Sequence, residues 1–214
     1  MKAQSAPLLL TTAYFPPLQY FALILNYPSV YIEKHENYSK QSYRNRCCIL
    51  SANGILPLII PVKRFRGKKT PISDVKPDNS YRWQRLHLIS IESAYRSAPF
   101  YEYYFDHIRP FFEKKYNFLL DMNCEILDKL LSVLNMPSKW QFTSSFRNEL
   151  PPEIIDMRDR IHPKPAKQDN NTFKHKEYIQ VFSDRHGFRE NLSILDLLFN
   201  TGPDAIDYLL TGTS

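Results

Sequence analysis

The segment from residue 8 to residue 32 constrains the fold of this chain most. The apolar run Leu8–Leu10 predicts a buried strand, which ends before Pro16-Pro17 because proline has no N–H to donate to a ladder. Leu18–Leu25 predicts a short helix, and Val30–Ile32 predicts a second strand. A strand, a helix and a strand in this order usually begin a parallel sheet. We therefore predict an α/β fold with a parallel or mixed central sheet.

The middle of the chain predicts a hairpin and three helices packed on this sheet. Asn53-Gly54 separates two apolar runs, and both residues tolerate positive φ, which indicates an antiparallel hairpin. The first helix is expected from Trp83 to Tyr95. The second begins at Pro99 and kinks or ends at Pro110, and the third has Asn117 as its N-cap.

The last third of the chain changes in composition. Residues 147 to 176 are rich in charge and proline, so we predict a long polar loop that moves when no ligand is bound, within a single domain of residues 1 to 214. Tyr178–Phe182 predicts a strand that returns to the sheet. Ser193 predicts the N-cap of a helix that Gly202 ends, and Pro203 begins a short terminal helix.

Composition limits where the protein works and what it binds. The three cysteines, Cys47, Cys48 and Cys124, are an odd number with two adjacent, which favours free thiols in a reducing compartment. No apolar run approaches the roughly 18 residues of a membrane-spanning helix, so we expect a cytoplasmic protein. The net charge of +6 is compatible with an anionic partner, but net charge alone is non-specific and favours a mildly basic solvated surface.

The segment EKHENYSKQSYRNR, residues 33 to 46, is the main candidate site. It follows a predicted buried strand, and ligands of open α/β sheets bind at the carboxyl ends of strands. Glu33 and His35 are the candidate catalytic acid–base residues, and Arg44 with Arg46 is suited to hold a phosphate or carboxylate. The alternative is a solvated loop with surface ion pairs. The candidate substrate-binding residues are Tyr14, Tyr38, Lys40, Tyr43, Arg44, Asn45, Arg46 and His87.

Other polar residues have both structural and functional interpretations. His87 lies on an apolar helix face, where a histidine is usually a satisfied core residue, but it also suits the wall of a pocket. Asp196 lies in the apolar run SILDLLFN, so its carboxylate must be paired or capped, unless it is exposed in the first helical turn. The basic stretch from residue 63 to 69 suits either phosphate binding or a solvated loop. With five glycines and no GxGxxG, P-loop or zinc spacing, the sequence predicts no metal site and names no cofactor.

Four motifs together resemble the WbqC-like family. They are YFPPLQYF at 14 to 21, NYSKQSYRNR at 37 to 46 followed by LPLIIPV, WQRLHLISIESAYRSAPFY at 83 to 101, and LSILDLLFNTG at 192 to 202. Leu10, Thr11 and Thr12 stand where many members carry His-Gln-Pro, and residues 147 to 176 replace a glycine-rich stretch. The chain is thus similar to a divergent member of that family.

The resemblance implies a transferase-like enzyme of surface-polysaccharide or activated-sugar metabolism. Its expected substrate is a small anionic molecule, nucleotide-linked or phosphorylated. The alternative is a non-catalytic ligand-binding or scaffold protein, which the missing histidine favours, so enzymatic activity is left open. Nucleic-acid binding is a weaker hypothesis, because it needs basic residues gathered on one face with exposed rings. Neither the reaction nor the oligomeric state follows from the sequence.

Overall fold

The chain begins with the parallel unit that its first 33 residues predict. The computed structural model describes residues 6–63, 69–164 and 173–212. Strand β1 (Leu8–Thr11) pairs in parallel with β2 (Val30–Glu33), and helix α1 (Leu18–Asn26) connects them. Both sides of β1 are buried, which is why its sequence is a continuous apolar run rather than an alternating one.

Two further strands complete a four-stranded sheet with the order β5-β2-β1-β6. β5 (Trp140–Phe142) pairs with β2, and β6 (Ile155–Asp156) pairs with β1, both in parallel. The sequence predicted neither strand, because they are only 3 and 2 residues long. β6 lies inside the segment that we interpreted as a polar loop. Since all these pairs are parallel, the carboxyl ends of the four strands meet at one edge of the sheet.

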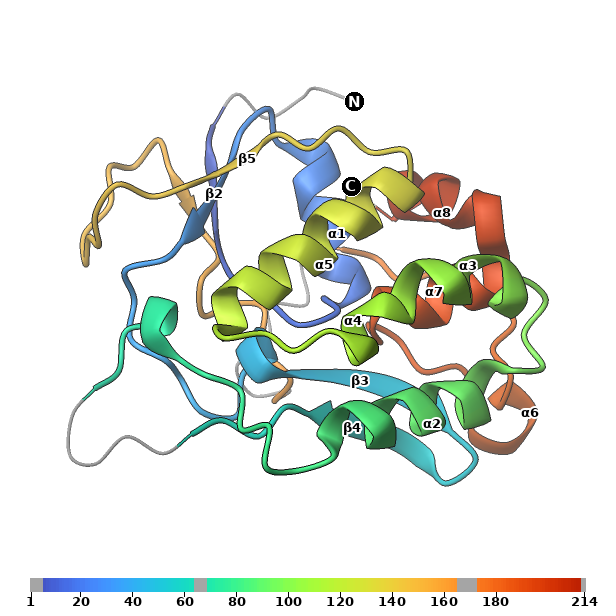
Figure 1. Ribbon diagram of the computed structural model, residues 1–214. Helices are drawn as coiled ribbons and strands as arrows, with labels where there is room; N and C mark the ends of the chain where they lie inside the picture. The colour runs from blue at the N-terminus through green and yellow to red at the C-terminus, as the bar shows by residue number, and fades with distance from the viewer. Residues whose placement is uncertain (1–5, 64–68, 165–172, 213–214) are drawn as a thin grey trace.

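The predicted hairpin forms a separate two-stranded sheet. β3 (Arg46–Ser51) and β4 (Gly54–Ile59) are antiparallel, with Arg46 opposite Ile59. Gly54 has a φ of 101°, which a residue with a Cβ rarely adopts. Figure 1 shows the hairpin and α2 together at the lower side of the molecule, while β2 and β5 lie at the upper left. The α/β class with a parallel sheet and an antiparallel hairpin is therefore confirmed.

The helices pack around both sheets. α2 (Trp83–Tyr95) has the predicted bounds, and Pro110 divides the second predicted helix into α3 (Tyr101–Ile108) and α4 (Pro110–Glu113). α5 covers Leu119–Val133, but Asn117 is not its cap: the flanking residue is Phe118, which makes no side-chain capping bond. The remaining elements are η1 (Tyr43–Asn45), η2 (Ile72–Asp74), α6 (Ser183–His186), α7 (Ile194–Thr201), η4 (Gly202–Asp204) and α8 (Ala205–Thr211).

The predicted strand at Tyr178–Phe182 is wrong. This segment has no regular secondary structure, and α6 follows it. Ile179 is 85% exposed, and the segment is held by side chains: the hydroxyl of Tyr178 and the amide of Gln180 both bind Asp196. These bonds fix the segment against α7 without a strand partner. Alternating side chains alone cannot distinguish such a segment from a strand.

The core is rich in aromatic rings. Tyr14, Phe15, Phe21 and Phe199 are fully buried, and Phe15 stacks on Phe112 with 5.8 Å between ring centroids. Burial of each ring contributes about 1.5–3 kcal/mol to folding. No helix in the described ranges is both long and apolar enough to cross a membrane. Residues 64–68 of the predicted basic loop lie outside the described residues.

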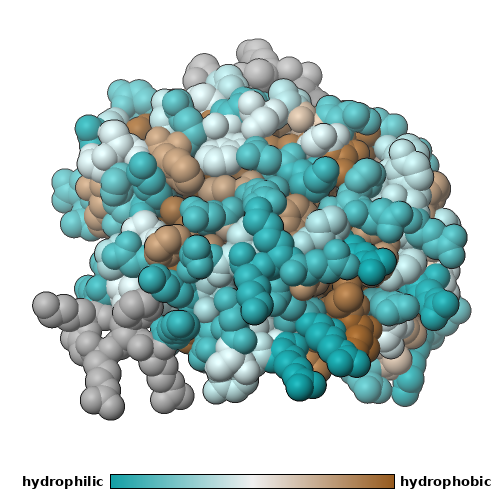
Figure 2. All heavy atoms as spheres, in the orientation of Figure 1, coloured by the Kyte–Doolittle hydropathy of each residue, from teal (hydrophilic) through white to brown (hydrophobic). Residues whose placement is uncertain are grey.

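The face of the molecule seen in Figure 2 is mainly hydrophilic. Hydrophobic residues gather near α2, where Leu86 and Ile89 are 63% and 49% exposed. Exposed apolar residues are common on protein surfaces.

Candidate functional site

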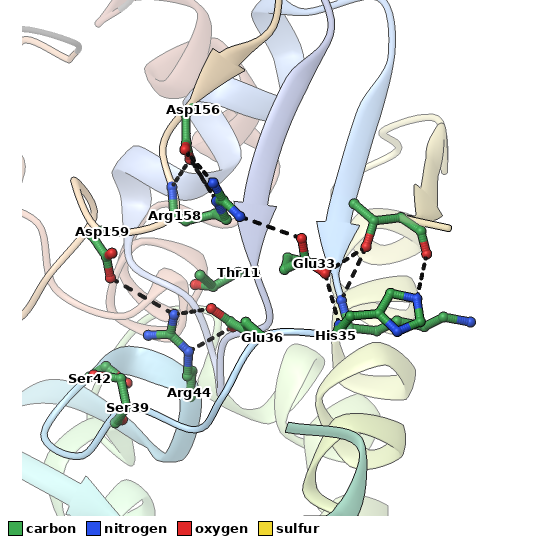
Figure 3. A network of polar contacts seen from close by, with 12 residues as sticks. Thr11, Glu33, His35, Glu36, Ser39, Ser42, Arg44, Asp156, Arg158 and Asp159 are labelled. Carbon is green, nitrogen blue, oxygen red and sulfur yellow. Dashed lines mark hydrogen bonds and ion pairs between the residues drawn. The ribbon is translucent and has the colours of Figure 1, made fainter. Parts of the chain in front are cut away.

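Polar and charged residues follow three parallel strands at one edge of the sheet. Thr11 ends β1 and Glu33 ends β2, while Asp156 ends β6 and leads into Arg158. In open α/β sheets this edge is where ligands bind. Figure 3 shows the side chains of Glu33, Asp156 and Arg158 pointing toward one another there.

Glu33 is buried behind this edge, with 1% of its surface exposed. One carboxylate oxygen accepts hydrogen bonds from the Thr143 hydroxyl at 2.7 Å and from the backbone N–H of His35 at 2.8 Å. The other lies 3.5 Å from a guanidinium nitrogen of Arg158. A buried carboxylate is tolerated only with such partners, so the surroundings of Glu33 hold it in one orientation.

Arg158 connects β6 with β2. Its Nε and Nη2 atoms donate to the two oxygens of Asp156 at 3.0 and 2.7 Å, and Nη1 donates to the carbonyl oxygen of Arg147 at 3.1 Å. Its guanidinium group also lies 5.1 Å from the ring centroid of Phe146. The hydrogen bonds that Arg158 donates to Asp156 raise the pKa of Arg158. Burial acts to raise the pKa of Asp156, but the bonds from Arg158 outweigh burial and lower it.

A second buried ion pair joins Arg44 to Glu36. Arg44 Nε donates to Glu36 Oε1 at 2.8 Å, Nη2 donates to the other oxygen, and Asp159 lies 4.0 Å away. Burial raises the pKa of Glu36, and the hydrogen bonds from Arg44 oppose that shift. The amide of Asn123 on α5 donates to the Arg44 carbonyl oxygen at 2.8 Å, which anchors the backbone of η1.

A cavity of about 540 Å³ lies against both ion pairs. This volume is in the range of small-molecule sites. Three carboxylates and three guanidinium groups line it, so charges of opposite sign are balanced within it. The lining residues are Glu36, Asn37, Ser39, Arg44, Phe146, Asn148, Asp156, Arg158, Asp159 and Arg160. We call this cavity the polar cleft.

A smaller hollow of about 130 Å³ lies on the other side of residues 143 to 148. Glu33, Thr143, Ser144, Ser145 and Arg147 line it, together with four apolar residues of the sheet and the following loop. Phe146 and Asn148 line the polar cleft instead. The segment after β5 therefore forms a wall between the two spaces.

The structure brings only part of the predicted site to the polar cleft. Among the candidates, Arg44 lines it and Glu33 binds its Arg158. The His35 ring does not bind the Glu33 carboxylate: it is exposed, and its Nε2 lies 3.2 Å from the Thr143 carbonyl oxygen. Lys40 is exposed, and Arg46 is half-buried on β3 without lining the cleft, so the two arginines do not form one anion site.

The other predicted binding residues lie in or near the core. The Asn45 amide donates to the Ile60 carbonyl oxygen at 2.8 Å, Tyr43 is 6% exposed, and Tyr38 is half-buried. Tyr14 was expected to bind the substrate, but it is fully buried, and its hydroxyl lies 2.9 Å from His87 Nδ1. The structure thus places the Tyr14–His87 pair in the core, and neither residue lines the cleft.

Sequence reasoning missed the residues that contribute most charge to the cleft. Asp156, Arg158, Asp159 and Arg160 come from the run DMRDR, which follows the apolar pair Ile154-Ile155. The signal was available, because an apolar stretch followed by charges is also the pattern of β2 and residues 33 to 36. We overlooked it because two apolar residues are too few to predict a strand.

A third polar cluster surrounds Asp196 on α7. Its carboxylate is fully buried and accepts hydrogen bonds from Tyr95, Tyr178 and Gln180 at 2.8, 2.8 and 2.9 Å. Burial raises the pKa of Asp196, while these bonds oppose that shift. Because all three partners are protein groups and the carboxylate is inaccessible, the paired structural interpretation of Asp196 holds. Within the described ranges, no three histidine, cysteine or acidic side chains gather as metal ligands.

Comparison with known proteins assigns the family. The family model of the WbqC-like proteins matches residues 12–163 and 166–208. The chain belongs to the WbqC-like family. The matched range includes every residue that lines the polar cleft. WbqC-like membership therefore confirms the resemblance that the four sequence motifs indicated.

The chain is also similar to the uncharacterized protein Rv1507c of Mycobacterium tuberculosis (strain ATCC 25618 / H37Rv). The two are 25% identical over 225 residues, which cover 92% of this chain and 94% of that protein. This low identity fits a divergent member of the WbqC-like family. No solved structure matches the chain significantly.

Proposed function

We propose that this protein is a transferase-like enzyme that binds a phosphorylated or nucleotide-linked sugar in the polar cleft. The carrying observation is the arrangement of the cleft: three guanidinium groups and three carboxylates around about 540 Å³ at the carboxyl ends of parallel strands. Activity in the cytoplasm, in surface-polysaccharide or activated-sugar metabolism, belongs to the same proposal. It is supported by membership of the WbqC-like family.

The mixture of charges suits a sugar phosphate better than a simple anion. Guanidinium groups bind phosphate through paired N–H donors, and carboxylates accept hydrogen bonds from sugar hydroxyls. Phe146 lines the cleft and is 45% exposed, so part of its ring is free to contact a sugar or a base. Three carboxylates repel an inorganic anion, so they do not suit a cleft that binds only such an anion.

Arg160 is the most accessible of the three arginines in the cleft. Arg158 and Arg44 are 9% and 3% exposed, whereas Arg160 is exposed. In this proposal Arg160 and Arg158 hold the phosphate, and Asp159 accepts from a hydroxyl. Glu33 orients Arg158 from behind. His35, whose exposed ring lies beside the Thr143 carbonyl oxygen and does not line the cleft, remains the acid–base candidate.

The first test is ligand binding by calorimetry and thermal shift, with nucleotide sugars, sugar phosphates and inorganic phosphate as probes. A ligand at about 100 times its dissociation constant stabilises the protein by about 2.7 kcal/mol. We expect one sugar phosphate or nucleotide sugar to bind, and Arg160→Gln to weaken it about tenfold. Arg85→Gln, an exposed change on α2, is the control and should leave binding unchanged. Equal binding by both variants would show that the cleft is not the site.

A non-catalytic binding protein is the second candidate. It is favoured by the state of the acidic groups: Glu33 and Glu36 are buried and bonded to protein partners, so neither is free to act as a base. Incubation with the bound sugar and candidate acceptors, followed by mass spectrometry, distinguishes an enzyme from a non-catalytic binding protein. Product that disappears in His35→Ala supports the enzyme, and binding without any product supports the second candidate.

A further inference from the structure

A second cavity lies away from the strand ends, between helices. It has a volume of about 550 Å³ and is formed by α3, the end of α5 and the segment from η4 into α8. Figure 1 shows the end of α5 close to α8 and above α3. It shares no lining residue with the polar cleft. We call it the helical cavity.

Aromatic and aliphatic side chains form about half of the walls of the helical cavity. Phe100, Tyr103 and Tyr104 contribute rings, and Val133, Leu134 and Ile206 contribute aliphatic groups. Tyr103 is 69% exposed although its ring packs edge-on against Tyr104, with centroids 4.8 Å apart. An exposed ring held in place by a neighbour is a ready stacking surface for a planar ligand.

The shape of this cavity is set by close packing at its base. Gly202 is a lining residue with a φ of 59°, and a Cβ at that position would lie 2.5 Å from the Phe100 ring. The backbone N–H of Phe100 also donates to the Phe199 carbonyl oxygen at 3.0 Å. Phe100 is therefore fixed against the end of α7, and the cavity is preformed.

The charged group that lines the helical cavity is positive, whereas charges of both signs line the polar cleft. Lys129 is its charged lining residue, and no aspartate or glutamate among the described residues lines it. No ion pair joins Lys129 to any described residue. The hydroxyl of Ser132 and the imidazole of His107 add hydrogen-bonding groups on the same and the facing helix. An ammonium group that lines the same cavity as aromatic side chains favours an anion that carries a ring.

Hydrogen bonds at the end of α5 reduce its opposition to an anion at Lys129. Carbonyl groups at a helix C-terminus disfavour negative charge. Here the carbonyl oxygens of Leu130, Leu131 and Ser132 already accept from the N–H groups of Leu134, Met136 and Asn135, at 3.0, 2.8 and 3.1 Å. Lys129 lies a full turn before the end of the helix.

From these observations we infer that the helical cavity is a second binding site, for a small aromatic anion. The ring of the ligand stacks on Tyr103, and its carboxylate or phosphate binds Lys129 and Ser132. The site is independent of the polar cleft and of the function proposed for it.

Phenyl phosphate is a suitable probe, because it has one ring and one anionic group. Titration calorimetry should show binding of phenyl phosphate but weaker or no binding of phenol and of inorganic phosphate. Lys129→Met should weaken binding about tenfold. Lys115→Met, the same change at an exposed lysine before α5, should have no effect. Tyr103→Ala should weaken binding, whereas Tyr81→Ala, at a tyrosine that is 62% exposed elsewhere, should not.

The polar cleft supplies the remaining control. If phenyl phosphate binds in the polar cleft instead, Arg160→Gln will weaken its binding and Lys129→Met will not. This result would overturn the proposal. No binding by the folded wild-type protein, or binding of inorganic phosphate as tight as that of phenyl phosphate, would also overturn it. Thermal unfolding of each variant shows whether a loss of binding reflects a loss of folding.

Discussion

At the scale of single residues, His87 shows how burial changes the chemistry of a side chain. Its ring lies 5.3 Å from that of Trp83 and bonds the hydroxyl of Tyr14. Burial lowers the pKa of His87 to about 4, although the backbone of Ile59 opposes the shift. A neutral imidazole in this position belongs to the core. It is therefore a determinant of stability rather than a residue of the cleft.

This pKa predicts a pH dependence of folding. His87 has a lower pKa in the folded protein than in the unfolded chain, so its contribution to stability is complete above pH 6.5 and is lost as the pH falls toward 4. The loss amounts to about 3 kcal/mol. We expect His87→Gln, which keeps a hydrogen-bonding group for Tyr14, to lack this component. Urea unfolding of both proteins from pH 7.5 to 4.5 measures the difference between their free energies of unfolding. The other titrating groups are the same in both proteins, so their contributions cancel in this difference. A difference that stays constant with pH would contradict the prediction.

At the scale of elements, the ends of α6 and α7 show what a glycine contributes. Gly187 ends α6 with φ 68° and ψ 176°, and Gly202 ends α7 with φ 59° and ψ −126°. Both conformations are strained for residues with a Cβ. Their surroundings differ, because nothing lies within 4 Å of a Cβ at Gly187, whereas the Phe100 ring occupies that space at Gly202.

The two glycines therefore form a matched pair for substitution. Gly187→Ala should lower the free energy of unfolding by about 1–3 kcal/mol through backbone strain alone. Gly202→Ala should cost about 1–3 kcal/mol more, because the Phe100 ring must move. Chemical denaturation followed by fluorescence compares the two. Equal losses would mean that the contact between Gly202 and Phe100 adds nothing to stability.

At the scale of the whole molecule, Arg158 joins segments that are far apart in the chain. It binds Asp156 on β6 and approaches Glu33 on β2, with β1 between the two strands. The pair of Glu33 and Arg158 has 1% and 9% of its side-chain surface exposed. Removing one member of a buried pair leaves the other charge without a partner.

A double-mutant cycle tests this connection. Arg158→Met should destabilise the protein by about 3 kcal/mol, because it leaves the Glu33 carboxylate buried without its counter-charge. The variant with both Arg158→Met and Glu33→Gln should lose at least about 1 kcal/mol less than the sum of the single changes. The exposed pair of Arg109, which lies between α3 and α4, and Glu113 on α4 is the control, and its cycle should show no measurable coupling. Additive losses at Glu33 and Arg158 would show that the two side chains act independently.

Local patterns were sufficient for the elements whose signals lie close together in the chain. The β1–α1–β2 unit, the hairpin at Asn53-Gly54, α2, and the helix that Ser193 caps were all predicted from adjacent residues. The hydrogen bonds that define them are local or join neighbouring segments, so periodicity and turn residues determine them. The four WbqC-like motifs can likewise be recognised from the sequence alone.

The tertiary structure alone decided where the charged side chains of residues 33 to 46 point and which residues they contact. β6 has two residues and exists because the N–H groups of Ile155 and Met157 donate to carbonyl oxygens of Pro7 and Leu9, each at 2.9 Å. That pairing brings Asp156 and Arg158 to Glu33, across more than a hundred residues of sequence. Composition made a polar site plausible, but long-range backbone pairing determined which residues form it, and no local pattern encodes such pairing.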